Sequence, residues 1–232
     1  MPDRARLNSN YRSVLDRIAA ACRRAGRSPD DVRLIAVTKS GELSWVETLV
    51  KLGARDLGES RPQQLVERAR QLGGEIHWHL IGHLQRNKVR QVLPFVQCIH
   101  SIDSARLLTR VDEVAKELGV RPRVLLEVNV SGEASKGGFR PEELAAEWPL
   151  LDAVENVEID GLMTMAPLLD DVERTRPVFR GLRELRDRLV FQQPAGPQLR
   201  ELSMGMSEDF EIAVEEGATM VRVGSLLFEG CA

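Results

Sequence analysis

The stretch LIAVTK, residues 34–39, decides how this chain is expected to fold. It is a short apolar run that follows the turn-forming residues Pro29, Asp30 and Asp31 and precedes a helical pattern. Such a run is typical of a strand buried on both faces in a parallel sheet. A lysine at the carboxyl tip of this strand is unusual. Partial desolvation there would favour its neutral amine, which is a nucleophile toward carbonyl groups. Alternatively, Lys39 extends out of the sheet into water.

The alternation of short strands and helices repeats along the whole chain. Strands are expected at 34–39, 56–59, 76–82, 98–103, 124–130, 159–166, 199–205 and 220–228. Helices are expected at 8–26, 43–52, 62–73, 87–93, 104–118, 141–151, 172–190 and 207–217. This pattern predicts one α/β domain over residues 1–232, a (β/α)8 TIM-type barrel with an extra N-terminal helix before strand one. No helix is expected after strand eight, so the first helix would cover the seam. An open doubly wound sheet is the alternative, although its Gly-rich dinucleotide fingerprint is missing.

The composition argues against several classes of protein. The chain has 32 Lys and Arg against 35 Asp and Glu, so no basic face for nucleic acid or a membrane surface is expected. The three cysteines, Cys22, Cys98 and Cys231, have no paired spacing for disulfides or a zinc knuckle. No apolar run approaches the roughly 20 residues of a membrane helix, and no signal peptide is visible. We therefore expect a cytoplasmic protein with small-molecule or protein partners. It is expected to be a monomer because no exposed heptad seam is apparent.

Functional side chains of such barrels gather at the carboxyl ends of the strands. The polar residues expected there are Lys39, Glu59, Ser60, His83, Ser101, Asp103, Asn129, Ser131, Thr164, Ser203, Arg222, Gly224 and Ser225. In strand eight, the two-residue period turns Val221 and Val223 toward the helices and Arg222 into the barrel. A guanidinium in that position requires an anionic or hydrogen-bond-accepting partner. The alternative is a structural ion pair of Arg222 with Glu127 or Asp160.

A phosphate group is expected near strands seven and eight, as is common in these barrels. Gly224 allows close backbone approach, and Ser203 and Ser225 add hydroxyl donors. A helix capped by Ser207 begins with acidic residues at 208–209, which would repel an anion at its N-terminus. The phosphate is therefore expected nearer Gly224 and Ser225.

The histidines of strand three suggest a different kind of site. His77, His79 and His83 are expected on one face of that strand, and this spacing could begin a metal centre. Only His100 remains as a further imidazole. The favoured interpretation is core histidines with hydrogen-bond partners. A metal-dependent hydrolase stays open as an alternative.

A nucleophilic lysine, a phosphate seat and an inward arginine in one barrel mouth would suit pyridoxal 5′-phosphate (PLP). Several segments support this hypothesis. They are AVTKS (36–40), GES (58–60), WHLIGHLQRNK (78–88), HSIDS (100–104), NVSGEASKGGF (129–139), GLMTMAP (161–167) and LSMGMSEDFEIAVEEGATMVRVGS (202–225). Together they resemble the pyridoxal phosphate homeostasis protein family, known in bacteria as the YggS family.

The resemblance implies a barrel related to the N-terminal domain of alanine racemase. It implies that Lys39 carries PLP as an aldimine, that Arg222 lies beside the pyridine nitrogen, and that the phosphate contacts are those expected above. One departure is Ser60, where the family usually has asparagine. The expected cofactor-binding residues are Lys39, Ser60, His83, Ser203, Arg222, Gly224 and Ser225. Lys136 is either a second aldehyde-reactive amine or a solvated loop charge.

The expected function is to carry or buffer PLP without catalysis, and so to maintain vitamin B6 homeostasis and supply PLP-dependent apoenzymes. A cation beside the ring nitrogen opposes its protonation and weakens the ring as an electron sink. Racemisation would also need bases on both faces of the substrate, whereas the single tyrosine, Tyr11, lies in the first helix. A PLP-dependent amino acid racemase using Lys39 and His83 is the alternative.

Overall fold

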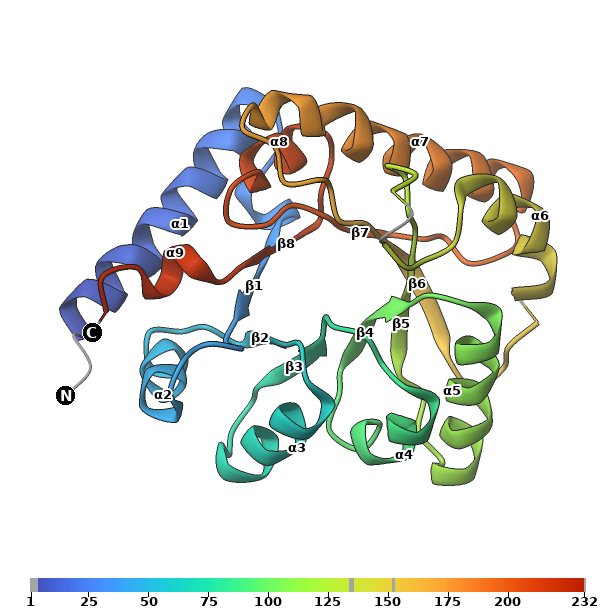
Figure 1. The fold of residues 1–232 in the computed structure, drawn as a ribbon, viewed down its shortest axis with the longest axis horizontal. Coiled ribbons are helices and arrows are strands. Elements are labelled where there is room, and N and C mark those ends of the chain that lie inside the picture. Colours follow the sequence, from blue (N-terminus) through green and yellow to red (C-terminus); the bar gives the residue numbers. More distant parts are fainter. Residues whose placement is uncertain (1–3, 134–135, 152, 232) are drawn as a thin grey trace.

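The structure is a computed structural model that describes residues 4–133, 136–151 and 153–231, and it confirms the expected barrel. Eight parallel strands form a closed ring in sequence order, with β8 returning to pair with β1 (Figure 1). The strands are β1 (Arg33–Val37), β2 (Asp56–Glu59), β3 (His77–Leu80), β4 (Cys98–Ile102), β5 (Arg123–Glu127), β6 (Glu158–Met163), β7 (Glu201–Ser203) and β8 (Met220–Val223). The open-sheet alternative is therefore wrong. Of the motif at 129–139, residues 134–135 lie outside the described part.

Helices surround the barrel. The α-helices are α1 (Arg4–Arg24), α2 (Leu43–Lys51), α3 (Pro62–Gln71), α4 (Val89–Val92), α5 (Ala105–Leu118), α6 (Pro141–Leu151), α7 (Arg176–Gln192), α8 (Phe210–Glu215) and α9 (Ser225–Phe228). Short 3-10 turns are η1 (Pro29–Asp31), η2 (Arg86–Lys88) and η3 (Val172–Thr175). As expected, α1 covers the seam, where it packs on α2, α8 and α9 (Figure 1). The expectation that no helix follows strand eight is wrong, because α9 begins two residues after β8.

The core has two apolar layers, one outside and one inside the barrel. The outer layer lies between strands and helices, and it contains Val221 and Val223 as predicted. The small inner layer is made by Ile35, Cys98, Leu125, Met163 and Met220. Barrels of this size are filled by side chains, so the interior is a packed core and no pore. A functional cavity is therefore to be found above this layer, at the strand ends.

The strands that carry the expected site end earlier than the sequence suggested. β1 stops at Val37, so Lys39 lies in a turn beyond the strand. β8 stops at Val223, where the chain bends into α9. Ser207 is not the cap of α8, whose N-cap position is occupied by Asp209. Because the chain turns away directly after these short strands, the residues that follow them lie at the mouth of the barrel.

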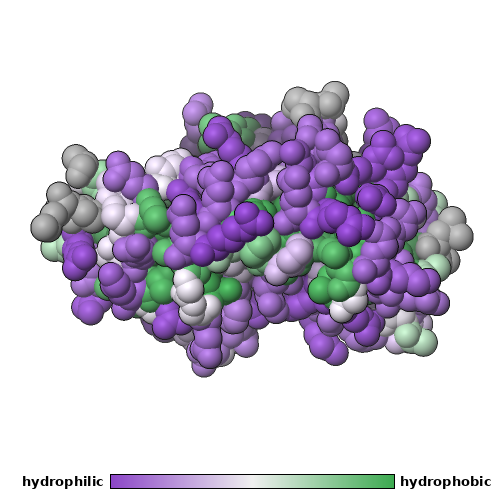
Figure 2. All heavy atoms as spheres, turned by 90° about the horizontal axis from the view of Figure 1, so that it is seen from below, coloured by the Kyte–Doolittle hydropathy of each residue, from purple (hydrophilic) through white to green (hydrophobic). Residues whose placement is uncertain are grey.

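The surface of the described part carries few large hydrophobic side chains. Those left exposed are Leu15, Leu168, Phe191 and Met206. Figure 2 shows one face on which hydrophilic side chains predominate, with hydrophobic atoms visible between them. Among the described residues, no helix combines the length and apolar character needed to cross a membrane.

Candidate functional site

A cavity of about 450 Å³ lies at the carboxyl ends of β1 and β8. Its volume is in the range of small-molecule sites. It is lined by Val37, Lys39, Ser40, Ser60, Ile81, Met165, Met206, Ser207, Glu208, Arg222, Gly224, Ser225 and Phe228. Five of the expected cofactor-binding residues are thus brought together here: Lys39, Ser60, Arg222, Gly224 and Ser225. His83 and Ser203 do not line this cavity.

Lys39 lies at the corner of a tight turn between β1 and α2. The turn is closed by a hydrogen bond from the Gly41 N–H to the Thr38 carbonyl oxygen, at 2.8 Å. The lysine is exposed, so partial burial is not found, and the alternative, that Lys39 extends into water, fits the structure. The reason is that β1 ends two residues before Lys39, which leaves the amine at the rim of the cavity.

Arg222 points into the barrel, as predicted, and is buried. Its Nη1 donates to Ser203 Oγ at 2.6 Å, and its Nη2 donates to the Thr164 carbonyl oxygen at 3.0 Å. Burial lowers the pKa of Arg222 to about 10, although the charges of Asp209 and Glu127 act to raise it. The guanidinium is therefore charged at neutral pH and presents a cation to the cavity.

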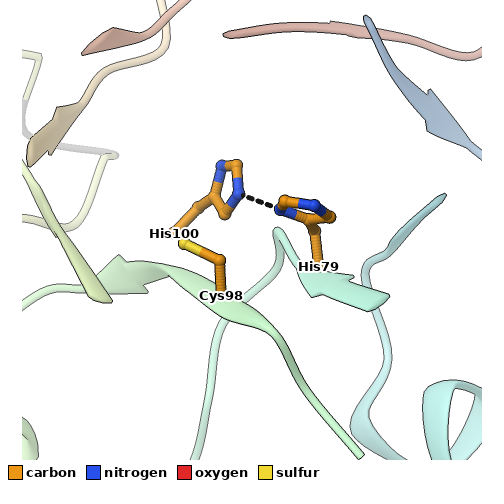
Figure 3. A group of neighbouring side chains, drawn as sticks. All are labelled: His79, Cys98 and His100. Carbon is orange, nitrogen blue, oxygen red and sulfur yellow. Dashed lines mark hydrogen bonds between the residues drawn. The ribbon is translucent and has the colours of Figure 1, made fainter. Parts of the chain in front are cut away.

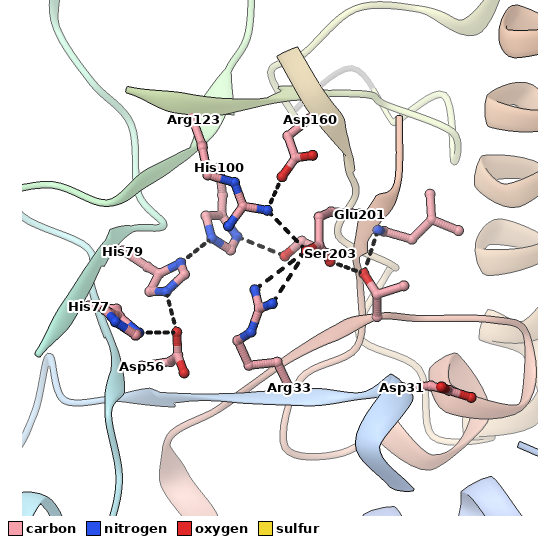
Figure 4. A network of polar contacts seen from close by, with 12 residues as sticks. Asp31, Arg33, Asp56, His77, His79, His100, Arg123, Asp160, Glu201 and Ser203 are labelled. Atoms are coloured by element: carbon pink, nitrogen blue, oxygen red, sulfur yellow. Dashed lines mark hydrogen bonds and ion pairs between the residues drawn. The ribbon is translucent and has the colours of Figure 1, made fainter. Parts of the chain in front are cut away.

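The alternative role of Arg222 as a structural ion-pair partner is wrong. Asp160 instead pairs with Arg123, at the amino end of the barrel (Figure 4). Glu127 acts on Arg222 through its charge, and no ion pair between them is found in the described part of the chain. The partners of Arg222 are neutral, so its positive charge is available to a ligand.

Ser203 lies behind Arg222, below the cavity wall. Its hydroxyl is buried, accepts from Arg222 and contacts His100 Nδ1 at 2.8 Å. The hydroxyl is therefore occupied within the protein. The expected phosphate contact of Ser203 is not supported by this geometry.

A continuous hydrogen-bonded chain runs from Ser203 through the barrel to Asp56 (Figure 4). His100 Nε2 lies 2.9 Å from His79 Nδ1, and His79 Nε2 lies 3.0 Å from the Asp56 carboxylate. The Asp56 carboxylate can only accept, so with both histidines neutral the Ser203 hydroxyl accepts from Arg222 and donates its proton to His100 Nδ1. Each histidine then carries its proton on Nε2 and donates toward Asp56, a tautomer assignment that follows from the bond directions. All members are satisfied with both histidines neutral.

The environment of these histidines agrees with this assignment. Burial lowers the pKa of His79, against the hydrogen bond to Asp56. The pKa of His100 is held well below 6.5 by burial first, and the positive charge of Arg222 acts in the same direction. For Asp56, burial acts to raise the pKa, but the hydrogen bond from His79 and the charge of Arg33 act to lower it, and the pKa is lowered on balance. The interpretation as satisfied core histidines therefore fits His79 and His100.

A metal centre on one face of strand three is not formed in the described structure. His77 is exposed and reaches Asp56 at 3.3 Å, whereas His83 lies beyond the strand, 3.2 Å from the Asp103 carboxylate. The nearest grouping is His79, Cys98 and His100, whose ligand atoms lie within 4.8 Å of one another (Figure 3). Both ring nitrogens of His79 and of His100 are already hydrogen-bonded. Burial raises the pKa of the Cys98 thiol. This grouping is an inner part of the core.

The opposite side of the cavity offers hydrogen-bond donors for an anion. The Ser207 hydroxyl accepts from the Gly224 N–H at 3.3 Å, which holds the two segments together. The next N–H groups, at 225–226, begin α9 and have no partner inside the helix. A Cβ at Gly224 would press against Val37, with contacts from 3.2 Å. The hydroxyls of Ser207 and Ser225 and these N–H groups are suitable donors to phosphate oxygens. Glu208 also lines the cavity, and its charge opposes an anion there.

Ser60 is held in place by the neighbouring strand end. A Cβ at Gly82 would overlap the Ser60 carbonyl oxygen, so only glycine fits there. The Ser101 hydroxyl donates to the Gly82 carbonyl at 2.6 Å and fixes this contact from below. Lys136 lies outside the cavity wall, where its Nζ is 3.1 Å from both the Glu133 carboxylate and the Met165 carbonyl oxygen. It is therefore not a freely solvated charge.

Sequence reasoning missed several residues of this site. The sequence predicts Ser207 to be a helix cap and does not mark Met206, Met165 or Phe228 as site residues, although all four line the cavity. The signal for Ser207 is its place in the segment at 202–225, four residues after the end of β7. Hydroxyls in such loops bind either the backbone or a ligand, and sequence does not distinguish the two.

Comparisons with known proteins agree with this geometry. The family model described as alanine racemase, N-terminal domain, matches residues 10–231. A solved alanine racemase from Clostridium difficile superposes with a TM-score of 0.74 at 20% identity, over 95% of this chain and 56% of that chain. At this identity the likeness shows the fold alone. Fold and site thus define a barrel of the alanine racemase N-terminal type.

Relatives of similar length are more informative. The chain is 42% identical over 216 residues to the pyridoxal phosphate homeostasis protein of Aquifex aeolicus, covering 93% of this chain and 94% of that protein. It is 36% identical over 230 residues to the protein of that name from Bos taurus, covering 94% and 84%. PipY of Synechococcus elongatus, solved with PLP bound, superposes with a TM-score of 0.83 at 38% identity, over 93% of this chain and 99% of PipY. The chain belongs to the pyridoxal phosphate homeostasis protein family.

Proposed function

We propose that this protein binds PLP in the cavity, holds it covalently through the Lys39 amine as a Schiff base, and thereby buffers the free cofactor. The observation that carries the proposal is that one cavity combines the Lys39 amine, the charged Arg222 and the donor-rich segment at 224–226. The names of the relatives, and the PLP-bound structure of PipY, support the same ligand.

The residues of the cavity fit the three parts of PLP. Lys39 would supply the primary amine that condenses reversibly with the aldehyde of PLP, with the carbonyl oxygen leaving as water. Its phosphate would be held by Ser207, Ser225 and the N–H groups at the start of α9. Arg222 would contact the pyridine nitrogen as a hydrogen-bond donor, because a guanidinium has no acceptor for a proton on that nitrogen.

A carrier is favoured over a racemase by the surroundings of Arg222. A guanidinium that stays charged opposes protonation of the ring nitrogen, and the ring is then a weaker electron sink. The sole tyrosine, Tyr11, lies on α1. It is near Arg55 and Asp56, which lie at the amino end of the barrel. It cannot serve as a base at the mouth. His83, the other base considered, does not line the cavity.

The test is an absorption spectrum of the purified protein with PLP, before and after borohydride reduction. Reduction is expected to fix the cofactor to the peptide that contains Lys39, and Lys39→Ala is expected to lose this label. Lys51→Ala, which removes an exposed lysine from α2, is the matched control. Label on another lysine would refute the proposed attachment. Steady exchange of an amino acid α-proton with solvent deuterium would instead favour the racemase.

The buffering role also predicts how the protein is used. We propose a cytoplasmic monomer that releases PLP to PLP-dependent apoenzymes. Mixing the loaded protein with such an apoenzyme is expected to restore the activity of that enzyme. The molecular mass measured by light scattering is expected to be that of one chain. A dimer, or an apoenzyme that stays inactive, would contradict the corresponding part of the proposal.

A further inference from the structure

We infer that the buried ion pair of Glu59 and Arg68 is a clamp that positions the turn bearing Lys39, and so sets how readily the Lys39 amine reacts with an aldehyde. The inference rests on the proposed function, because it assigns Lys39 as the reacting group. Neither clamp residue lines the cavity, so both would act through the turn alone.

One guanidinium holds both ends of the turn. Arg68 Nη1 donates to the Thr38 carbonyl oxygen at 2.8 Å, and Arg68 Nη2 donates to the Gly41 carbonyl oxygen. These are the first and last residues of the turn, and Lys39 lies between them. The chain can therefore not unwind at Lys39 without breaking bonds to Arg68.

Glu59 completes the clamp from the end of β2. Its side chain is fully buried, forms the ion pair with Arg68 and accepts from the Thr38 hydroxyl. Burial acts to raise the pKa of Glu59, and the bonds from Thr38 and Arg68 act against it. Taking two charges out of water is costly, so this pair is poorly explained by fold stability alone. Its bonds converge on the backbone that flanks Lys39.

The turn is also in contact with the ring of Phe228. A Cβ at Gly41 would meet the ring of Phe228 at 3.0 Å. Phe228 stacks on Trp45 of α2 with ring centroids 5.5 Å apart, and it lines the cavity. The turn is thus fixed between α3 and α9. An amine held in one place reacts faster than a mobile one because the entropy of positioning has already been lost.

A lysine at position 68 would not perform the same task. The planar guanidinium has five donors in a fixed arrangement, whereas an ammonium is a compact point charge. A lysine ammonium would keep the charge balance with Glu59, but it cannot reach the two carbonyl oxygens of the turn and the Glu59 carboxylate at the same time. Arg68→Lys therefore separates positioning from charge, and Arg68→Met removes both.

The experiment compares Arg68→Met and Arg68→Lys with Arg70→Met. Arg70 lies on the same helix, is exposed and contacts Phe95 instead of the turn. The rate at which PLP becomes trappable by borohydride is expected to fall by about 10- to 100-fold in both Arg68 variants, the range for small losses of alignment. Arg70→Met is expected to react at the wild-type rate. In a Lys39→Ala background, non-covalent PLP affinity is expected to be unaffected by Arg68→Lys.

A second readout needs no cofactor. Amide hydrogen exchange of the peptide covering residues 38–46 is expected to speed up in Arg68→Lys and to stay unchanged in Arg70→Met. Faster exchange would support the clamp even if the wild type took up no PLP, a result that would refute only the proposed function. Should Arg68→Met fail to fold, Arg68→Lys carries the test. Unchanged exchange or an unchanged trapping rate in Arg68→Lys would overturn the inference.

Discussion

Acidification from pH 7.5 to 5.5 is expected to destabilise the protein through His100. This imidazole is fully buried and its pKa is held well below 6.5, so it stays neutral when folded. In the unfolded chain its pKa returns to about 6.5, and the unfolded state then binds the extra proton. Stability is therefore lost as the pH falls through 6.5. For a histidine that stays neutral when folded, this interval costs about 1.4 kcal/mol of unfolding free energy.

The assay is urea unfolding at both pH values for the wild type and His100→Gln. The variant is expected to be less stable at either pH, because one amide cannot replace both imidazole nitrogens. Its loss on acidification is nevertheless expected to be about 1.4 kcal/mol smaller than that of the wild type. Titration of groups that do not contact His100 is common to both proteins and cancels in the comparison. His83→Gln is the control, because it removes an exposed imidazole that lies outside the buried histidine chain.

The result that would refute this reasoning is an equal loss of stability in the wild type and in His100→Gln. It would mean that His100 takes up a proton inside the folded barrel. The tautomer assignment of the chain from Arg222 to Asp56 would then be wrong, because a protonated imidazole has no acceptor for the Ser203 proton.

Two further predictions concern the cavity wall. Gly82→Ala is expected to lower the unfolding free energy by about 1–3 kcal/mol, because the new Cβ overlaps the backbone of Ser60. Urea unfolding measures this, with Gly73→Ala, where nothing lies within 4 Å, as the control; equal effects would contradict the packing argument. Ser207→Ala is expected to weaken PLP binding about fivefold, by the ~1 kcal/mol of one lost hydrogen bond. An absorbance titration measures this, against Ser13→Ala on α1; unchanged affinity would remove Ser207 from the site.

The sequence alone determined the barrel and the direction of its key side chains. Alternation of strands and helices is a local pattern, and parallel strands joined in this way close in sequence order. The two-residue period of β8 was enough to turn Arg222 inward, because side chains of a strand must alternate. Lys39 at the strand end was likewise sufficient to expect it at the mouth.

Only the tertiary structure decided which groups these residues meet. Arg222 bonds Ser203 and Thr164 instead of a carboxylate, and Ser203 bonds His100 at a separation of 103 residues. Whether Lys39 is buried, whether Ser207 caps a helix or holds Gly224, and what Arg68 binds were equally beyond the sequence. The physical reason is that a hydrogen bond forms only when donor and acceptor are placed to within a few tenths of an ångström. Such distances are set by how eight strands and their helices pack, and no local pattern encodes them.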